Sequence, residues 1–375
     1  MRGRILVVDH KTPTPDQDSG SASTFSYLQI LSRAGFEVTF APFNLTNAGR
    51  YTQALNDLGV KTLSWPEWSS IESVIEALAP CSDLLLLYRA PFAMHVFDLA
   101  RRVAPATKIL FHAVDLHFLR LQREAALSGS QAQADAASFL RAIELDLIER
   151  ADGSIVVSKY ELDLLRELLP TAIVHQIPIL RETPPQSSGS APSLQQRSDF
   201  LFIGGYEHLP NVDAVLWFVS EVWPIIQLRS FPRRFVIVGS KVPHNVAAIA
   251  SDKIEVRGYV KDLVPLFASC RLSVAPLRYG AGIKGKIVTS LSYGVPVVAT
   301  SIAAEGADLR HDESILIADT PAAMADQIIR LYDDDDLWQR LSANGYKTFQ
   351  DKFSLTAGAQ KVLAVVDGLV ASARR

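Results

Sequence analysis

Residues 271–300 read RLSVAPLRYGAGIKGKIVTSLSYGVPVVAT, and they contain an apolar strand, a glycine-rich loop, the start of a helix and a second apolar strand. Three glycines shape the loop, at Gly280, Gly282 and Gly285. Glycines let the backbone approach a ligand closely, and a helix that starts after such a loop directs unpaired N–H groups outward. Lys284 and Lys286 add positive charge at the same point. The stretch therefore predicts an α/β unit that binds a phosphorylated ligand.

Strand-like and helical stretches alternate on both sides of this segment. Upstream, the apolar strands RILVVD, EVTFAPF, DLLLLY, TKILFHAV, GSIVVS and AIVHQIPI are separated by segments of helical periodicity, and DFLFIGG opens a second series. Continuous apolar strands between helices indicate parallel sheets covered on both faces. We expect an α/β fold with two doubly wound Rossmann-like domains.

The domain boundaries follow from composition. Residues 181–198 read RETPPQSSGSAPSLQQRS and lose periodicity, which is typical of a solvated linker. The first domain is expected at residues 1–180 and the second at 199–354. A last amphipathic helix, at about residues 355–375, is expected to pack back on the first domain. The acidic run at 333–336 is interpreted as the cap of a helix that begins at Leu337, and not as a metal site.

Composition excludes some functions. With 48% hydrophobic residues and a net charge of -3, the chain reads as a soluble globular protein and not as a nucleic-acid binder. The only cysteines, Cys81 and Cys270, are expected to be core thiols of a protein kept in a reducing compartment. A local basic patch is interpreted as a solvated turn, with contact to an anionic membrane surface as the alternative; it consists of Arg229, Arg233 and Arg234.

The amino terminus, MRGRILVVDH, begins with a buried-strand pattern and predicts no signal peptide. The longest apolar runs, such as residues 82–88 and 295–300, are shorter than the roughly 20 residues needed to span a bilayer. We therefore expect a cytoplasmic protein, with peripheral contact at the inner face of the cell membrane left open. The sequence does not fix the oligomeric state.

The loop of residues 279–286 also satisfies the pattern G-x-G-x-x-G, and Glu305 lies beyond the next strand, as in a dinucleotide fingerprint. This supports an NAD-dependent oxidoreductase as an alternative. Lys284 within the fingerprint and Lys286 after it favour a terminal diphosphate instead. Glycines needed only for a tight turn are the structural alternative.

Polar residues follow other strands. The first strand leads into DHKTPTPDQDSGS, where Gly20 and Ser21 are candidates for phosphate contact and Ser19 or Asp18 for a helix cap. The stretch FIGGYEHLPNVDAV places Gly204 and Gly205 after the second domain's first strand. The two glycines either permit close approach of a ligand or only form a turn. For His208 and Asn211, the structural alternative is that they only cap and connect.

The segment HAVDLHFLRLQRE brings a polar cluster to the end of a core strand: His112, Asp115, His117, Arg120 and Arg123. A histidine near a carboxylate can orient a hydroxyl or stabilise a developing positive charge. Each histidine alone is as readily a structural residue, so both interpretations stay open.

These features together resemble the GT-B glycosyltransferases of the family 4 type, the glycosyl transferases group 1. The resemblance rests on the two doubly wound domains, the Ser/Gly loop, FIGGYEHLPNVDAV, and the stretch that runs from RLSVAPLRYGAGIKGK to TSIAAEG. It covers essentially the whole chain, and its specific part is about residues 200–320. It implies two domains that face each other across a cleft.

The resemblance implies a retaining glycosyltransferase that moves a hexosyl or deoxyhexosyl group from a nucleotide diphosphate sugar to a saccharide or glycolipid acceptor, in surface polysaccharide biosynthesis. The donor is a substrate, and no cofactor or metal is expected. The nearest sequence to a metal-binding Asp-x-Asp is D-Q-D at residues 16–18. Negative charge accumulates on the leaving diphosphate, and Lys284 is expected to stabilise it with help from Lys286 and Arg278. His117 or Asp115, with His112 as a third choice, would lie near the reacting sugar.

The chain also departs from the family pattern. The positions of two characteristic glutamates are occupied by Ala281 and Thr289, which puts ribose recognition by Thr289 in question. A basic pair after the second domain's first strand is replaced by Gly205, Tyr206 and Glu207. A catalytically weak GT-B module that binds a nucleotide is therefore a further alternative.

Overall fold

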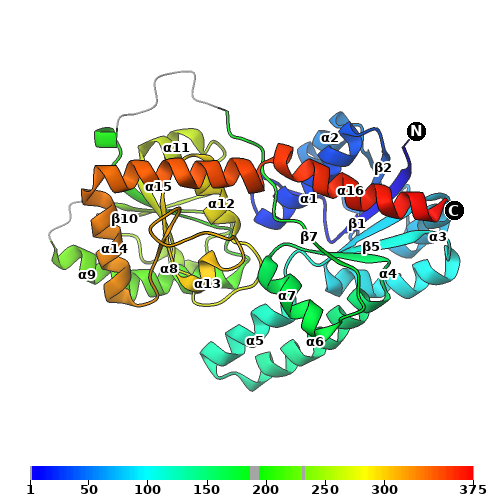
Figure 1. Ribbon diagram of the computed structural model, residues 1–375, viewed down its shortest axis with the longest axis horizontal. Coiled ribbons are helices and arrows are strands. Elements are labelled where there is room, and N and C mark those ends of the chain that lie inside the picture. Colours follow the sequence, from blue (N-terminus) through cyan, green and yellow to red (C-terminus); the bar gives the residue numbers. More distant parts are fainter. Residues whose placement is uncertain (1, 186–193, 230–232, 375) are drawn as a thin grey trace. The chain divides into compact units, whose positions relative to one another are not determined.

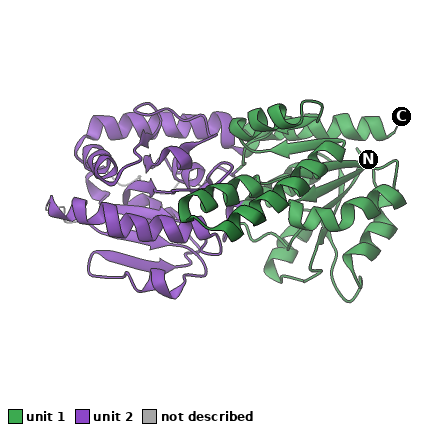
Figure 2. Cartoon of the chain, turned by 90° about the horizontal axis from the view of Figure 1, so that it is seen from below, with its two compact units in different colours: residues 1–15, 20–180, 355–375 green, residues 16–19, 181–354 purple. Residues whose placement is uncertain are grey.

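The computed structural model describes residues 2–185, 194–229 and 233–374, so residues 186–193 of the predicted linker lie outside the described residues. The chain divides into two compact units (Figures 1 and 2). Unit 1 comprises Met1–Pro15, Gly20–Leu180 and Leu355–Arg375, and unit 2 comprises Asp16–Ser19 and Arg181–Ser354. Residues 16–19, which the sequence placed in the first domain, thus group with unit 2, because their contacts are made there.

Unit 1 contains a seven-stranded sheet in the order β3-β2-β1-β4-β5-β6-β7. Every strand pairing in it is parallel, with Ile5 opposite both Val38 and Leu84. The strands are β1 Arg4–Asp9, β2 Glu37–Pro42, β3 Lys61–Thr62, β4 Leu84–Tyr88, β5 Lys108–His112, β6 Gly153–Val156 and β7 Val174–Gln176.

Helices connect these strands and cover the sheet (Figure 1). They are α1 Ser19–Arg33, α2 Arg50–Asp57, α3 Ile71–Leu78, α4 Ala90–Val103, α5 His117–Ser128, α6 Gln131–Arg150, α7 Lys159–Leu168 and, from the end of the chain, α16 Leu355–Ala373. The side chains of β4 are almost fully buried on both faces, as expected for a central strand between two helical layers.

Unit 2 repeats this design with a six-stranded parallel sheet in the order β10-β9-β8-β11-β12-β13. Its strands are β8 Asp199–Ile203, β9 Phe235–Val238, β10 Ile254–Gly258, β11 Cys270–Ala275, β12 Val297–Ala299 and β13 Leu316–Ile317. Its helices are α8 Leu209–Trp217, α9 Trp223–Leu228, α10 His244–Ala247, α11 Val264–Ser269, α12 Gly285–Ser292, α13 Ser301–Ala304, α14 Pro321–Asp333 and α15 Asp335–Thr348. The predicted α/β class with two doubly wound sheets is confirmed.

The strand order reverses direction at one place in each sheet. In unit 1 this is the step between β1 and β4, and in unit 2 it is the step between β8 and β11. In open α/β sheets, the connections leave such neighbouring strands in opposite directions, so a crevice opens beyond their carboxyl ends. A ligand site in unit 2 is therefore expected beside the loops after β8 and β11.

Several local expectations need correction. Helix α8 begins at Leu209, with Pro210 in its first turn, and a π turn at Phe218–Val222 follows it. The polar segment after β5 is itself a helix, α5. The acidic run caps as expected, but Asp334 is the cap, it accepts the Leu337 N–H, and α15 begins at Asp335. Cys270 is buried, whereas Cys81 is exposed and not a core thiol.

Two helical stretches are long and apolar enough to cross a membrane by length and composition alone, Leu209–Leu228 and Leu355–Ala373. The expectation from contiguous apolar runs overlooked them, because mean hydropathy over a window tolerates interruptions. In the first stretch Phe218 and Val222 are fully buried within unit 2. In the second, Val362 and Val366 belong to the core of unit 1. Each stretch thus contributes a face to a packed core.

Helix α16 covers the unit 1 sheet near β4 and β5. Val362, Val366 and Val370 recur at helical spacing and are buried. Gly358 sits against Leu180, since a Cβ at that glycine would lie 2.1 Å from a Leu180 methyl carbon. This close approach fixes where the helix begins to pack.

Gly358→Ala is expected to destabilise unit 1 by about 1–3 kcal/mol, because the new methyl overpacks a fully buried leucine. Gly368→Ala on the same helix is the matched control: its Cβ would meet nothing within 4 Å, so helix propensity alone predicts a gain of up to about 1 kcal/mol. Urea unfolding measures both, and equal effects would contradict the packing of α16.

Candidate functional site

The loops that follow β8 and β11 meet in unit 2 through Asn211, in the first turn of α8. Its Nδ2 donates to the Gly205 carbonyl at 2.7 Å, and its Oδ1 accepts from Lys286 Nζ at 2.7 Å. Asn211 is buried, and a Cβ at Gly204 would lie 2.7 Å from its Nδ2. Glycine at 204 therefore leaves room for the amide that links the two loops.

Lys286 is held by neutral groups. Besides the Asn211 amide, its ammonium lies 5.3 Å from the centre of the Phe202 ring, in cation–π geometry. Burial, and to a smaller extent the charge of Lys284, lowers the pKa of Lys286 from 10.5 to about 7. Removal from water disfavours the ammonium form, and an anion bound beside it would restore that form. Lys286 is thus a cation set up to receive negative charge.

Lys284 occupies the N-cap position of α12 and is 7% exposed. Its Nζ donates to the Gly282 carbonyl at 2.7 Å, so the side chain folds back over the loop. A Cβ at Gly280 would lie 3.2 Å from Lys284 Cε, and both Gly280 (φ 152°) and Gly282 (φ 63°) adopt backbone angles that disfavour other residues. The glycines therefore shape a loop around the lysine.

A third cation lies at the same helix N-terminus. Arg181 Nη2 donates to the Ser19 hydroxyl at 2.5 Å and to the Ser19 carbonyl at 3.2 Å. A Cβ at Gly285 would come within 2.1 Å of that hydroxyl and 3.0 Å of Arg181 Nη2. Burial lowers the pKa of Arg181 from 12.5 to about 10, and the charge of Asp18 partly offsets this. Arg181 stands at the start of a polar connector, where no local sequence pattern marks it as part of a site.

Other predicted residues of unit 2 lie around this centre. Arg278 forms a two-pronged ion pair with Asp213, so its charge is compensated by a carboxylate. Thr289 lies on α12 and is partly buried, Ala281 is 9% exposed, and Glu305 follows α13. The structure thus brings the two predicted lysines together with Asn211 and Arg181.

The stretch after β8 carries no free basic pair. Glu207 forms an ion pair with Lys241, and burial raises the pKa of Tyr206 above its usual value. His208 occupies the N-cap position of α8, but its side chain makes no cap hydrogen bond, so the predicted capping role is wrong for its ring. Asn211 was noted in the sequence only as a cap or connector, and its link to Lys286 was not foreseen.

In unit 1, the three catalytic candidates differ in burial, since His112 and His117 are buried and Asp115 is partly exposed. His112 is 1% exposed and stacks on Tyr88 with ring centres 4.7 Å apart. Its Nδ1 accepts the Val114 N–H, and burial lowers its pKa to about 3, so the ring is neutral. His112 is therefore a core residue, and the choice narrows to the loop that holds Asp115 and His117.

Two buried glutamates hold that loop. Glu144, which is fully buried on α6, accepts the N–H groups of His117 and Phe118 at 2.9 and 2.8 Å. Glu161 on α7 accepts the Leu116 N–H at 3.0 Å. Carboxylates suit a helix N-terminus, where backbone N–H groups lack partners. They fix the start of α5 and were not found from sequence, because both lie on other helices.

His117 itself lies between two carboxylates. Its Nε2 is 3.4 Å from Asp115 Oδ1 and its Nδ1 is 3.4 Å from Glu144 Oε1, while Asp115 also pairs with Arg120 at 3.2 Å. The remaining basic residue of the segment, Arg123, lies over the Tyr160 ring. The structure therefore brings together three members of the predicted cluster, Asp115, His117 and Arg120, and adds Glu144.

At the first-strand exit, the phosphate contact of Gly20 and Ser21 stays a prediction, and the structure shows how these residues are packed. Gly20 and Ser21 stand in the first turn of α1, and Ser21 is buried. A Cβ at Gly20 would lie 2.5 Å from Arg89 Nη2, and Arg89 pairs with the buried Asp9 at 2.9 Å. This ion pair joins the carboxyl ends of β1 and β4, at the step where the strand order reverses.

The dinucleotide hypothesis finds no geometric support. A fingerprint glycine turn joins the first strand of a Rossmann unit directly to a helix. Here the glycines follow β11 and not β8, and residues 276–284 separate that strand from α12.

Among residues 2–185, 194–229 and 233–374, no group of three or more His, Cys, Asp or Glu residues could hold a metal ion.

The basic patch predicted near residue 230 is compensated by neighbours. Arg229 pairs with Asp326, Arg234 with Asp199 and Glu255, and Arg233 lies over the Tyr332 ring. Two of the three arginines are thus ion-paired, and residues 230–232 between them lie outside the described residues.

Two doubly wound parallel sheets in one chain are the architecture of the GT-B fold, and the lysine-bearing glycine loop lies at the switch point of the second sheet. Residues 197–334 match the family model described as Glycosyl transferases group 1, so the part of the chain that holds this site is similar to that family. The resemblance inferred from the sequence is confirmed at this level, and the family 4 subtype stays a prediction.

Solved structures share the fold over almost the full chain. Sucrose-phosphate synthase from Thermosynechococcus elongatus has a TM-score of 0.74 at 15% identity, with 98% of this chain and 99% of that chain covered. HepE of Anabaena, in complex with UDP-glucose, has a TM-score of 0.72 at 14% identity, with 98% and 100% covered. TarM of S. aureus, in complex with UDP, has a TM-score of 0.74 at 10% identity, with 98% and 99% covered.

A curated relative is known from Klebsiella pneumoniae, described as "Uncharacterized 44.6 kDa protein in cps region". It is 21% identical over 162 residues, which cover 41% of this chain. The match spans 42% of that relative's length.

Stability is expected to report the state of Lys286. Its pKa is about 7 in the folded chain and near 10.5 when unfolded, so the unfolded chain binds more protons between these values. Stability should therefore rise with pH across that window, and Lys286→Met should remove this contribution. Urea unfolding from pH 7 to 10 measures the difference, and parallel curves for the two proteins would contradict the low pKa.

Asn211→Asp is expected to place a carboxylate beside Lys286 Nζ and to raise the pKa of that lysine, because an opposite charge favours the ammonium. Titration of the Lys286 Cε resonance, assigned by its loss in Lys286→Met, measures this directly. An unchanged midpoint in Asn211→Asp would show that the amide does not contact the lysine in solution.

Glu144→Ala is expected to destabilise unit 1 by about 2–4 kcal/mol, since two N–H groups lose their acceptor. Glu144→Gln should cost less, because its amide has one acceptor oxygen. Glu149→Gln, at an exposed position of α6, is the control and should change stability by less than about 0.5 kcal/mol. The order Ala, Gln, control in urea unfolding is the expected result; a neutral Glu144→Ala would overturn it.

Proposed function

We propose that this chain transfers a hexosyl or deoxyhexosyl group from a nucleotide diphosphate sugar to a saccharide or glycolipid acceptor, with retention of anomeric configuration. The observation that carries the proposal is the pair of lysines at the N-terminus of α12. Lys284 is 7% exposed, and the ammonium of Lys286 donates to an amide oxygen and lies over an aromatic ring. Such a site gains most from a bound anion with several oxygens.

The chemistry of sugar transfer suits this arrangement. When the glycosidic bond breaks, negative charge accumulates on the diphosphate, and cations placed in advance stabilise it in the transition state. The N–H groups at the start of α12 add to this effect. Lys284 is assigned the larger role, with Lys286 and Arg181 around it, while Arg278 would first have to release Asp213. This charge set supports transfer without a metal ion.

Retention requires a separate account. Retaining glycosidases use a carboxylate nucleophile about 5 Å from an acid. We propose instead that departure and attack occur on the same face of the sugar, with the leaving phosphate as base. His117 and Asp115 are assigned to the neighbourhood of the reacting sugar, where His117 would stabilise or orient the acceptor hydroxyl.

The comparisons support the substrate class and setting. HepE is described in complex with UDP-glucose, and a pneumococcal neighbour, GtfA, in complex with UDP and GlcNAc. The Klebsiella relative, described from the cps region, supports a role in surface polysaccharide biosynthesis. We propose a cytoplasmic enzyme that works at the inner face of the cell membrane.

A nucleotide panel tests the function. Calorimetry is carried out with UDP, GDP, dTDP and ADP, and with NAD as the comparison. One of the four nucleoside diphosphates should give a clear binding signal, and NAD should give none. Lys284→Ala and Lys286→Met should each weaken binding of the preferred nucleotide by roughly 10- to 100-fold, the value of a charged hydrogen bond. Lys253→Ala, at an exposed position of unit 2, is the control. A panel without any binding would overturn the proposal, and an NAD signal would restore the oxidoreductase alternative.

Turnover distinguishes an enzyme from a weak nucleotide-binding module. The corresponding nucleotide sugar should release its nucleoside diphosphate, and Lys284→Ala should abolish release. Tight binding without release from any donor would instead favour the module suggested by Ala281 and Thr289.

A further inference from the structure

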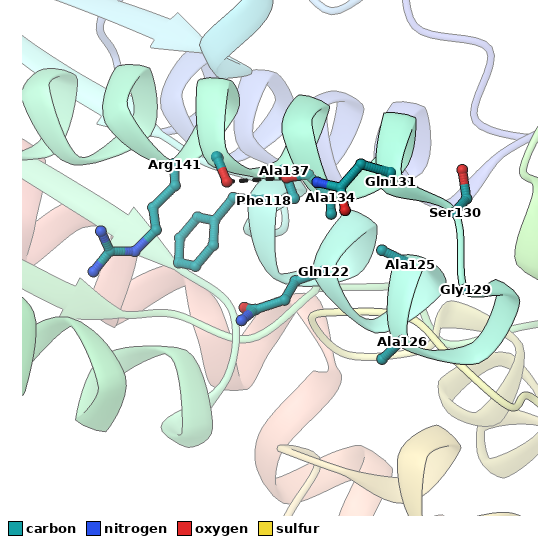
Figure 3. Close-up of a pocket in the computed structure, with 11 residues that line it drawn as sticks. Phe118, Gln122, Ala125, Ala126, Gly129, Ser130, Gln131, Ala134, Ala137 and Arg141 are labelled. Atoms are coloured by element: carbon teal, nitrogen blue, oxygen red, sulfur yellow. Dashed lines mark hydrogen bonds between the residues drawn. The ribbon is translucent and has the colours of Figure 1, made fainter.

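A pocket of about 400 Å³ lies between α5 and α6 of unit 1 (Figure 3). Its residues are Phe118, Gln122, Ala125, Ala126, Gly129, Ser130, Gln131, Ala134, Ala137, Ser138 and Arg141. The alanines explain the hollow, because their methyl groups leave the space between the two helices unfilled. The volume falls within the range of small-molecule sites.

The floor of the pocket is apolar and its walls are polar. Phe118 and Ala137 are buried, whereas Gln122, Gln131 and Arg141 are exposed. Figure 3 shows the Phe118 ring of α5 beside the Arg141 side chain of α6, and Gln122 lies on α5 with Phe118. A ring under a rim of amides and hydroxyls matches a sugar, which has an apolar C–H face and a hydroxylated edge.

Unused hydrogen-bonding groups distinguish the walls. The Gln122 side chain makes no hydrogen bond and Arg141 no ion pair with any residue that the structure describes, and the Arg141 guanidinium lies 6.0 Å from the centre of the Phe118 ring. The Gln131 side-chain amide donates to Asp135, and its oxygen stays available as an acceptor. None of the described lining residues is acidic, so the pocket carries the single charge of Arg141 and favours an anionic ligand.

The pocket begins beside the proposed catalytic loop. Phe118 directly follows His117, and Glu144 fixes both through their backbone N–H groups. A ligand that packs on the Phe118 ring would therefore lie along α5 and begin next to His117, which is assigned to the neighbourhood of the reacting sugar. This continuity connects the pocket to the acceptor and not to the nucleotide.

From this we infer that the α5–α6 pocket is a subsite for an acidic saccharide, a sugar residue of the acceptor that carries a carboxylate and pairs with Arg141. The inference rests on the proposed transferase function. Gln122 and Gln131 would bind hydroxyl groups, and the Phe118 ring would pack against the sugar's C–H face.

Saturation-transfer difference NMR tests the subsite without any donor. The probes are a glucuronic-acid-containing oligosaccharide and a neutral glucose oligosaccharide of the same length. The wild-type chain should bind the acidic probe at least tenfold more tightly. Arg141→Gln should remove this preference, and Ala134→Leu, which fills the pocket, should abolish binding of the acidic probe.

Two matched control variants distinguish a loss of the subsite from misfolding. Ala132→Leu adds the same volume on an exposed part of α6 outside the lining, and Arg102→Gln removes an exposed arginine of α4; both should leave binding unchanged. Nucleoside diphosphate binding, measured on every variant, should be retained, so that a loss of donor binding is distinguished from a loss of the subsite. No binding of the acidic probe, equal binding of both probes, or binding that survives Ala134→Leu would each overturn the inference.

Discussion

The contact between Lys286 and Asn211 is the interaction around which the unit 2 site is organised. It joins a helix that follows β8 to a helix that follows β11, and it leaves the ammonium beside a neutral oxygen at 2.7 Å. A carboxylate at that place would neutralise the lysine, and water would keep its pKa high. The amide does neither, so the lysine holds a position at which a bound anion gains most. The tight backbone at Gly204 is needed to admit this amide.

The same principle explains the glycine loop. Gly280 and Gly282 have backbone angles that let the loop curl around Lys284, and Gly285 gives space to Ser19 and Arg181. Each glycine thus serves the placement of a cation or of its hydrogen-bond partner. In unit 1 the buried groups are carboxylates and not cations: Glu144 and Glu161 accept the N–H groups at the start of α5. The two units therefore contain sites of different charge, one prepared for an anion and one organised by carboxylates.

Much of the fold could be predicted from periodicity. Strand β4 is as buried as its LLLLY sequence indicates, and the last helix, α16, packs its apolar face in unit 1 as predicted. Helix α5 was missed, because HFLRLQRE mixes charges with apolar residues and drew attention as a polar cluster. His112 was a reasonable catalytic candidate by position, yet its ring is enclosed by Tyr27 and Tyr88 in the core. Burial of a single polar side chain is a property of packing and leaves no local pattern.

The sequence by itself determined the alternation of strands and helices, the two-unit plan, and the glycine loop with its two lysines, because each of these is written within a short stretch of chain. Only the tertiary structure decided which groups meet those lysines. Asn211 lies 75 residues from Lys286, and Ser19 lies 162 residues from Arg181. It likewise decided that Arg278 is paired with Asp213 and that Glu144 fixes the loop of His117. Partners so far apart are chosen by strand order and helix packing, and these are set by the whole core.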